Sequence, residues 1–203
     1  MAERGRPRGF DRAAALHRAM ELFWARGYEG TAMTDLTAAM GINSPSLYAA
    51  FGSKEALFRE ALALYEAGEG GTTARSLESE PTARRAVEAM LRDNATAYVA
   101  PGRPPGCMIV LASAVGIPAS PEVRGYLLES CRQSIARLKA RLDRGVADGD
   151  VPAGADTRAA AEFYSTVLNG LTIQARNGAD CPALHRVVDG AMAGWDAVVA
   201  PRD

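Results

Sequence analysis

The chain has 203 residues, of which 48% are hydrophobic and 23% are charged, and its formal net charge is −1. These values are those of an ordinary soluble globular protein of one or two domains, and they exclude a strongly basic protein that binds nucleic acid over its whole surface. Any DNA contact must therefore be local. The three cysteines are odd in number and irregularly spaced. Because we find no signal peptide, we expect reduced thiols in a cytoplasmic protein.

Residues 1–9 form a polar arm that contains glycine and proline, and we expect it to be disordered when free. Arginines recur at every second position from Arg4 to Arg8. Arginine on a thin, extended backbone suits the negative potential of a narrow minor groove. We therefore predict that Arg6 and Arg8 contact DNA in the minor groove or at phosphates. The alternative is a solvated tail.

Residues 10–26 are predicted to form the first helix, because large apolar residues recur there at helical spacing. A second helix is predicted over residues 31–40. Thr31 and Thr34 can supply capping hydroxyls, and Asp35 places a negative charge in the first turn. Gly41 can end this helix at once in a left-handed conformation.

A third helix is predicted to follow directly, with Asn43 or Ser44 as its cap and Pro45 in its first turn. Leu47 and Phe51 would face the preceding helix and leave a polar outer face. Two capped helices joined by a short turn around a glycine are typical of a DNA-binding helix-turn-helix.

The run GINSPSLYAAFGSKEALF, residues 41–58, closely resembles the DNA-binding module of the TetR-type (TetR/AcrR) transcriptional regulators. The similarity extends back through residues 10–28. It implies a dimeric, all-helical repressor whose C-terminal domain binds a small effector.

By this resemblance, Thr31 and Thr34 contact the DNA backbone and Tyr48 donates its hydroxyl to a phosphate. By the same resemblance, Lys54 contacts the DNA backbone on the far side of the third helix. The alternative gives Tyr48 a packing role and leaves Lys54 as a solvated charge. The small residues at the outward start of the third helix are candidates for base readout. The complete predicted DNA-binding set is Arg6, Arg8, Thr31, Thr34, Asn43, Ser44, Pro45, Ser46, Tyr48, Ala49 and Lys54.

Six further helices are predicted at about residues 53–68, 81–100, 107–115, 120–148, 157–176 and 182–199, with a loop over 68–80. No stretch alternates as a strand does. The predicted fold class is all-α with about nine helices. A flexible basic arm (1–9) precedes a three-helix helix-turn-helix DNA-binding domain (10–60), and a larger helical effector-binding and dimerisation domain (61–203) follows.

The resemblance also implies an effector pocket between about residues 81 and 176. Its predicted lining is Tyr98, Cys107, Met108, Leu111, Tyr126, Phe163 and Gln174. Cys107 begins a helix, where the macrodipole can stabilise a thiolate, and some similar family members sense electrophiles or oxidants with a cysteine in this region. The alternative is a small buried hydrophobe.

The dimer interface is predicted on the last two helices, where small residues would allow close approach. Its predicted residues are Phe163, Val167, Gly170, Leu184, Val188, Ala191 and Trp195. The alternative for this stripe is packing within one chain.

No nucleophile elbow, zinc-protease motif or complete phosphate loop occurs, and no cluster has metal-ligand spacing. We therefore predict no catalytic residues, metal or cofactor. The longest uncharged stretch, residues 104–121, is too short to span a membrane. The expected partners are a double-stranded DNA operator, a second copy of the chain and an unidentified small-molecule effector. Two alternatives to this ligand-responsive repressor are a DNA-binding adaptor without effector and a small-molecule-binding enzyme with a vestigial helix-turn-helix.

Overall fold

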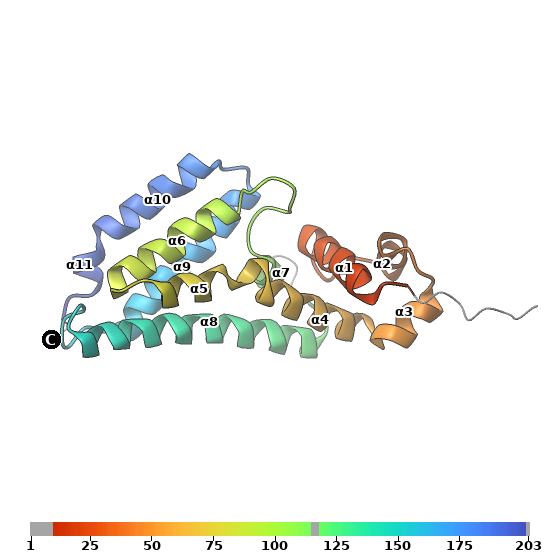
Figure 1. Ribbon diagram of the computed structural model, residues 1–203, viewed down its shortest axis with the longest axis horizontal. Coiled ribbons are helices and arrows are strands. Elements are labelled where there is room, and N and C mark those ends of the chain that lie inside the picture. The colour runs from red at the N-terminus through yellow and green to blue at the C-terminus, as the bar shows by residue number, and fades with distance from the viewer. Residues whose placement is uncertain (1–9, 115–117, 202–203) are drawn as a thin grey trace, which may run out of the picture.

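The computed structural model describes residues 10–114 and 118–201. Within these ranges the chain forms eleven α-helices, one short 3₁₀ helix and no β-strand, which confirms the all-α prediction (Figure 1). Among the described helices, none combines the length and the apolar character that a membrane span requires. The α-helices are α1 (Arg12–Arg26), α2 (Met33–Met40), α3 (Ser44–Phe51), α4 (Lys54–Ala67), α5 (Thr72–Ser79), α6 (Ala83–Ala97), α7 (Met108–Ala114), α8 (Pro121–Asp148), α9 (Thr157–Arg176), α10 (Cys181–Ala193) and α11 (Trp195–Val198).

Local side-chain caps set the boundaries of the first four helices. Asp11, Asn43 and Ser53 each accept a hydrogen bond from the backbone N–H three residues ahead, and so begin α1, α3 and α4. Gly41 ends α2 in the left-handed conformation, with φ of 69°. The start of α2 differs from the prediction, because its first turn is closed by the Asp35 carboxylate, which accepts from the Ala32 N–H at 3.1 Å.

The buried apolar side chains form two cores. The first core joins α1–α4 to α7 and to the first turns of α8, and the second core joins α5, α6, α9, α10 and α11 to the later turns of α8. Figure 1 shows α8 as a long helix that runs from beside α4 to the far end of the molecule. A single continuous helix therefore contributes to both cores.

Two segments differ from the helices predicted from sequence. Residues 72–79 form α5 instead of a loop, because Leu77 is buried against α6 and the Ser76 hydroxyl donates to Asp93 at 2.7 Å. The last predicted helix is divided at Gly194 into α10 and α11. Both differences depend on contacts with distant parts of the chain.

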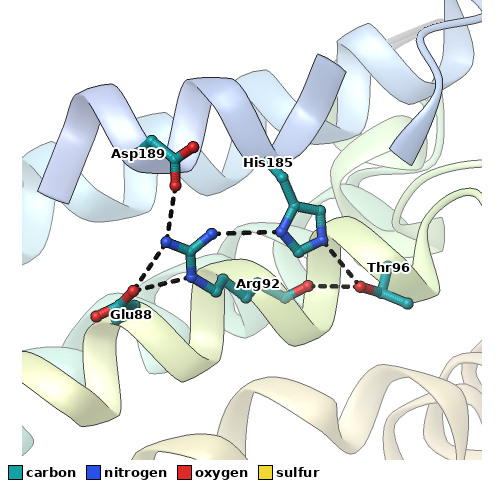
Figure 2. Close-up of polar contacts among 5 residues, drawn as sticks. All are labelled: Glu88, Arg92, Thr96, His185 and Asp189. Atoms are coloured by element: carbon teal, nitrogen blue, oxygen red, sulfur yellow. Dashed lines mark hydrogen bonds and ion pairs between the residues drawn. The ribbon is translucent and has the colours of Figure 1, made fainter. Parts of the chain in front are cut away.

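A polar cluster fastens α10 to α6 (Figure 2). The Arg92 guanidinium donates to Glu88 at 2.9 Å and to Asp189 at 2.7 Å, and its Nη1 lies 3.4 Å from His185 Nδ1. An arginine nitrogen only donates, so Nδ1 must accept. The Thr96 hydroxyl donates to the Arg92 carbonyl at 3.0 Å, so His185 Nε2, 3.1 Å from that hydroxyl oxygen, must carry the proton. This arrangement of partners matches a His185 ring that accepts at Nδ1 and donates from Nε2.

Candidate nucleic-acid interface

Helix α3 presents a polar face away from the first core. Leu47 and Phe51 are buried against the neighbouring helices, whereas Tyr48 is 50% exposed. Four other predicted contact residues lie on the accessible side of α3 or at its start, namely Asn43, Ser44, Pro45 and Ala49, and Ser46 is half-buried. The Asn43 side chain accepts from the Ser46 N–H at 2.9 Å. The exposed hydroxyls and methyl groups of α3 could therefore reach a DNA groove while its leucine and phenylalanine hold it on the protein.

The N-termini of α2 and α4 flank this face. Thr34 is exposed in the first turn of α2, and Lys54 is the first residue of α4. The Lys54 ammonium lies 4.2 Å from the centre of the Tyr28 ring, and burial lowers the pKa of Lys54, although the carboxylates of Glu29 and Glu55 act against this shift. Helix N-termini and a held ammonium both favour phosphate binding.

Thr31 does not lie on this surface. It is 0% exposed, and its hydroxyl donates to the Gly27 carbonyl oxygen at 2.7 Å. The prediction that Thr31 contacts the DNA backbone is therefore wrong, because the side chain is committed to the turn between α1 and α2. Arg6 and Arg8 lie outside the described residues.

Among the described residues, three hydrogen bonds that involve a side chain join residues 10–60 to the rest of the chain. Trp24 Nε1 on α1 donates to the Gly106 carbonyl at 3.0 Å, and Arg176 at the end of α9 donates to the Ala25 carbonyl at 2.7 Å. The Ala119 N–H, just before α8, donates to the Glu29 carboxylate at 2.6 Å. These anchors hold the orientation of α1 and could transmit a displacement of the larger part to α3.

Four predicted pocket residues meet where the two cores join. Tyr98 is buried in the second core, Met108 and Leu111 are buried in the first, and Cys107 packs against both. Burial raises the pKa of the Cys107 thiol, although hydrogen bonds with Tyr65 and with backbone N–H groups of α7 act in the opposite direction. The direction of this shift is opposite to the stabilisation of a thiolate that we expected at the start of this helix.

The other three predicted pocket residues lie elsewhere. Phe163 is 42% exposed and Gln174 is also exposed on α9, so neither is buried at the junction of the two cores, and their assignment to the pocket lining stays a prediction. Tyr126 faces α4, where its hydroxyl donates to Glu66 at 3.3 Å and the Arg59 guanidinium lies 5.6 Å from the centre of its ring. It is therefore separate from the Cys107 cluster.

The predicted dimer residues divide between core and surface. Leu184, Val188 and Trp195 are buried in the second core, so they cannot meet a second copy, and that part of the prediction is wrong. The predicted residues that keep exposed surface are Phe163, Val167, Gly170 and Ala191. Val187, which we did not assign to the interface from sequence, is also exposed on α10, with 46% of its surface accessible. It lies outside the apolar stripe of α10 that packs into the second core.

A capped α2–turn–α3 unit with a polar outer face, docked on a larger helical body, defines a helix-turn-helix DNA-binding transcriptional regulator. The family model described as "Bacterial regulatory proteins, tetR family" matches residues 15–61. The chain is 33% identical over 200 residues to the HTH-type transcriptional repressor ComR of Escherichia coli (strain K12), a match covering 97% of this chain and 94% of the relative. The chain belongs to the TetR family, which confirms the predicted family and function class.

Two further relatives agree. The HTH-type transcriptional repressor BdcR of Escherichia coli (strain K12) is 30% identical over 174 residues, covering 86% of this chain and 83% of the relative. A solved structure of the TetR family transcriptional regulator CifR, a cysteine mutant complexed with 26-bp double-strand operator DNA, is 46% identical with a TM-score of 0.89. That match covers 94% of this chain and 100% of the other. The fold of this chain is thus that of a regulator seen with operator DNA.

Proposed function

We propose that this protein is a repressor that binds a pseudo-palindromic operator as a homodimer and releases it when a small effector binds. The observation that carries the proposal is the outward polar face of α3, held on a fold whose 46% identical relative CifR is described with operator DNA. A two-fold dimer presents two such helices about 34–36 Å apart, one turn of the DNA helix. Nothing in this role calls for catalysis, and its place is the cytoplasm, where the DNA is.

We propose that residues 10–60 bind DNA, that residues 61–203 bind the effector and form the dimer, and that the arm 1–9 reaches DNA through Arg6 and Arg8. Phosphate contacts from Thr34, Tyr48 and Lys54 would set the register of the protein on the DNA and would supply much of the affinity for DNA. Base readout would come from the start of α3. The residues assigned there are Asn43, Ser44, Pro45, Ser46 and Ala49.

Effector release is proposed to begin at the junction of the two cores. A ligand seated against Tyr98, Cys107, Met108 and Leu111 would displace the backbone at Gly106. Because Trp24 donates to that carbonyl, the displacement would reach α1 and change the tilt of α3. The effector acts only through its higher affinity for the tilted state, as a shift of population.

The second copy is proposed to meet the exposed faces of α9 and α10. Phe163, Gly170 and Val187 offer exposed apolar or small surface there, and Val167 and Ala191 are partly exposed beside them. Apolar side chains of this size are seldom left uncovered in a cluster on a monomer.

The proposal is tested by selecting binding sites from random double-stranded DNA and then titrating the selected site at several salt concentrations. A palindromic consensus bound by two chains, with log affinity falling linearly with log salt, is the expected result. Failure to enrich any sequence would overturn it. A screen for compounds that release the complex then separates an effector-controlled repressor from an adaptor without effector.

A further inference from the structure

Arg141 on α8 is a buried cation, and two of its nitrogen atoms have no partner in the described part of the chain. The residue is 4% exposed, and one terminal nitrogen, Nη2, donates to the Glu80 carbonyl oxygen at 3.2 Å. Its Nε and Nη1 atoms are buried and have no hydrogen-bond partner among the described residues. A guanidinium stays charged at any ordinary pH, so each of these N–H groups requires an acceptor.

A cavity of about 230 Å³ lies between α5 and α8 and includes Arg141 in its wall. Figure 1 shows α5 lying along α8. Arg137, Arg141 and Arg144 follow the spacing i, i+4, i+7, which places them on one face of α8. Arg137 and Arg144 are exposed, and neither makes a hydrogen bond or ion pair within the described part of the chain. The remaining wall consists of Ala74, Leu77, Glu78 and Ala140.

Arginines outnumber carboxylates in the lining of this cavity. Among the lining residues, three guanidinium groups face one carboxylate, that of Glu78. Asp148 and Asp150 lie outside the lining but close enough to act on the charge of Arg141, and the Asp150 carboxylate accepts from the Ala83 N–H at 3.0 and 3.2 Å. Burial and the neighbouring charge of Arg144 both lower the pKa of Arg141. A bound anion would oppose both effects, because its charge stabilises the guanidinium cation.

We infer that this cavity binds a small organic monocarboxylate with a short apolar body, whose carboxylate pairs with the arginines of α8. The planar guanidinium fork matches a carboxylate, and Ala74, Leu77 and Ala140 supply apolar wall for the rest of the ligand. The site is separate from the Cys107 cluster, because Glu80 precedes α6 and Tyr98 follows it at the other end of a 15-residue helix. The inference does not rest on DNA binding.

The test is calorimetric titration of the full-length protein with hexanoate and benzoate, each paired with its uncharged amide and compared with inorganic phosphate. We expect both carboxylates to bind at least about tenfold more tightly than hexanamide and benzamide, and more tightly than phosphate. Absence of carboxylate binding, equal binding of the amides, or equal binding of phosphate would each overturn the inference.

Three variants locate the ligand. Arg137→Gln and Arg144→Gln change exposed residues and should leave the fold intact while weakening hexanoate binding about tenfold each. Arg141→Met should abolish binding, and the two exposed variants keep the test decisive if Arg141→Met does not fold. The matched control is Arg124→Gln, an exposed arginine on the same helix about 20 Å from Arg137 by helical rise. If Arg124→Gln weakened hexanoate binding as much as Arg144→Gln does, the binding site would not be local to this cavity.

Discussion

The indole Nε1 of Trp24 donates to the carbonyl oxygen of Gly106 at 3.0 Å, which ties α1 of the helix-turn-helix unit to the segment that leads into α7. Trp24→Phe leaves this buried carbonyl without its donor. We expect a loss of about 1–3 kcal/mol in the free energy of unfolding, measured by urea denaturation. Operator affinity should change as well, because α1 loses the hydrogen bond that fixes its position against Gly106.

The control is Trp195→Phe, a buried tryptophan that packs against Tyr164 in the second core. It should also lower stability but leave operator affinity of the folded protein unchanged. Equal effects of the two variants on operator affinity would show that the Trp24–Gly106 bond transmits nothing to α3.

Tyr48 is expected to act through its hydroxyl. Tyr48→Phe should weaken operator binding about tenfold, because a hydrogen bond to a charged phosphate is lost. The free energy of unfolding should stay within about 0.5 kcal/mol, since the side chain is half-exposed. Tyr126→Phe is the matched control, because its hydroxyl bonds to Glu66 away from α3. Fluorescence anisotropy with labelled operator measures both variants.

Lys54 is expected to contribute one phosphate contact. Lys54→Gln should reduce the slope of log affinity against log salt by about one unit and weaken binding to all sequences alike. Some stability is lost too, because the ammonium lies over the Tyr28 ring. A salt slope identical to that of the wild type would exclude Lys54 from the contact set.

Thr31 and Thr34 form a matched pair with opposite expected effects. Thr31→Val removes a buried hydrogen bond to Gly27 and should cost about 1–2 kcal/mol of stability, with the folded protein still binding operator. Thr34→Val changes an exposed hydroxyl and should weaken operator binding with stability nearly unchanged. Thermal unfolding and operator titration of both variants separate the two roles.

Glu55 makes the free energy of unfolding depend on pH in the acidic range. Hydrogen bonds from its own backbone N–H and from the Tyr28 hydroxyl, at 2.8 Å, lower its pKa below the usual 4.5. A depressed carboxyl pKa stabilises the folded state above the unfolded-state value, and this contribution is lost as pH falls through the folded-state value. Glu55→Gln should therefore be less stable than wild type at pH 7, and the difference should shrink steadily below pH 4.5. Tyr28→Phe should give an intermediate result in urea unfolding at a series of pH values.

The helix-turn-helix could be predicted from sequence because its signals are local. Asn43, Ser53 and Gly41 act on backbone groups within three or four residues, so the residue types themselves define the turn. The exposed position of Tyr48 follows from the same helical register. These parts of the structure require no knowledge of the rest of the fold.

Several residues were assigned to the wrong place from sequence, because their positions depend on packing between distant segments of the chain. Trp195 and Leu184 form an apolar stripe that suits an interface or a core equally well, and the positions of α6 and α9 decide between the two. Thr31 resembles an exposed cap in sequence but is buried by the turn after α1. Two donors of Arg141 have no partner among residues 10–114 and 118–201, and this could not be predicted because it depends on how α5 lies on α8.

Helix α8 places Val123 and Leu127 in the first core and Leu138 and Leu142 in the second, with no break in its 28 residues. At 1.5 Å per residue it is about 42 Å long. Melting either core therefore exposes part of the same helix and removes support from the other. We expect the DNA-binding unit and the larger helical part to unfold together in one cooperative calorimetric transition, so that damage far from α3 still reduces the amount of protein able to hold an operator.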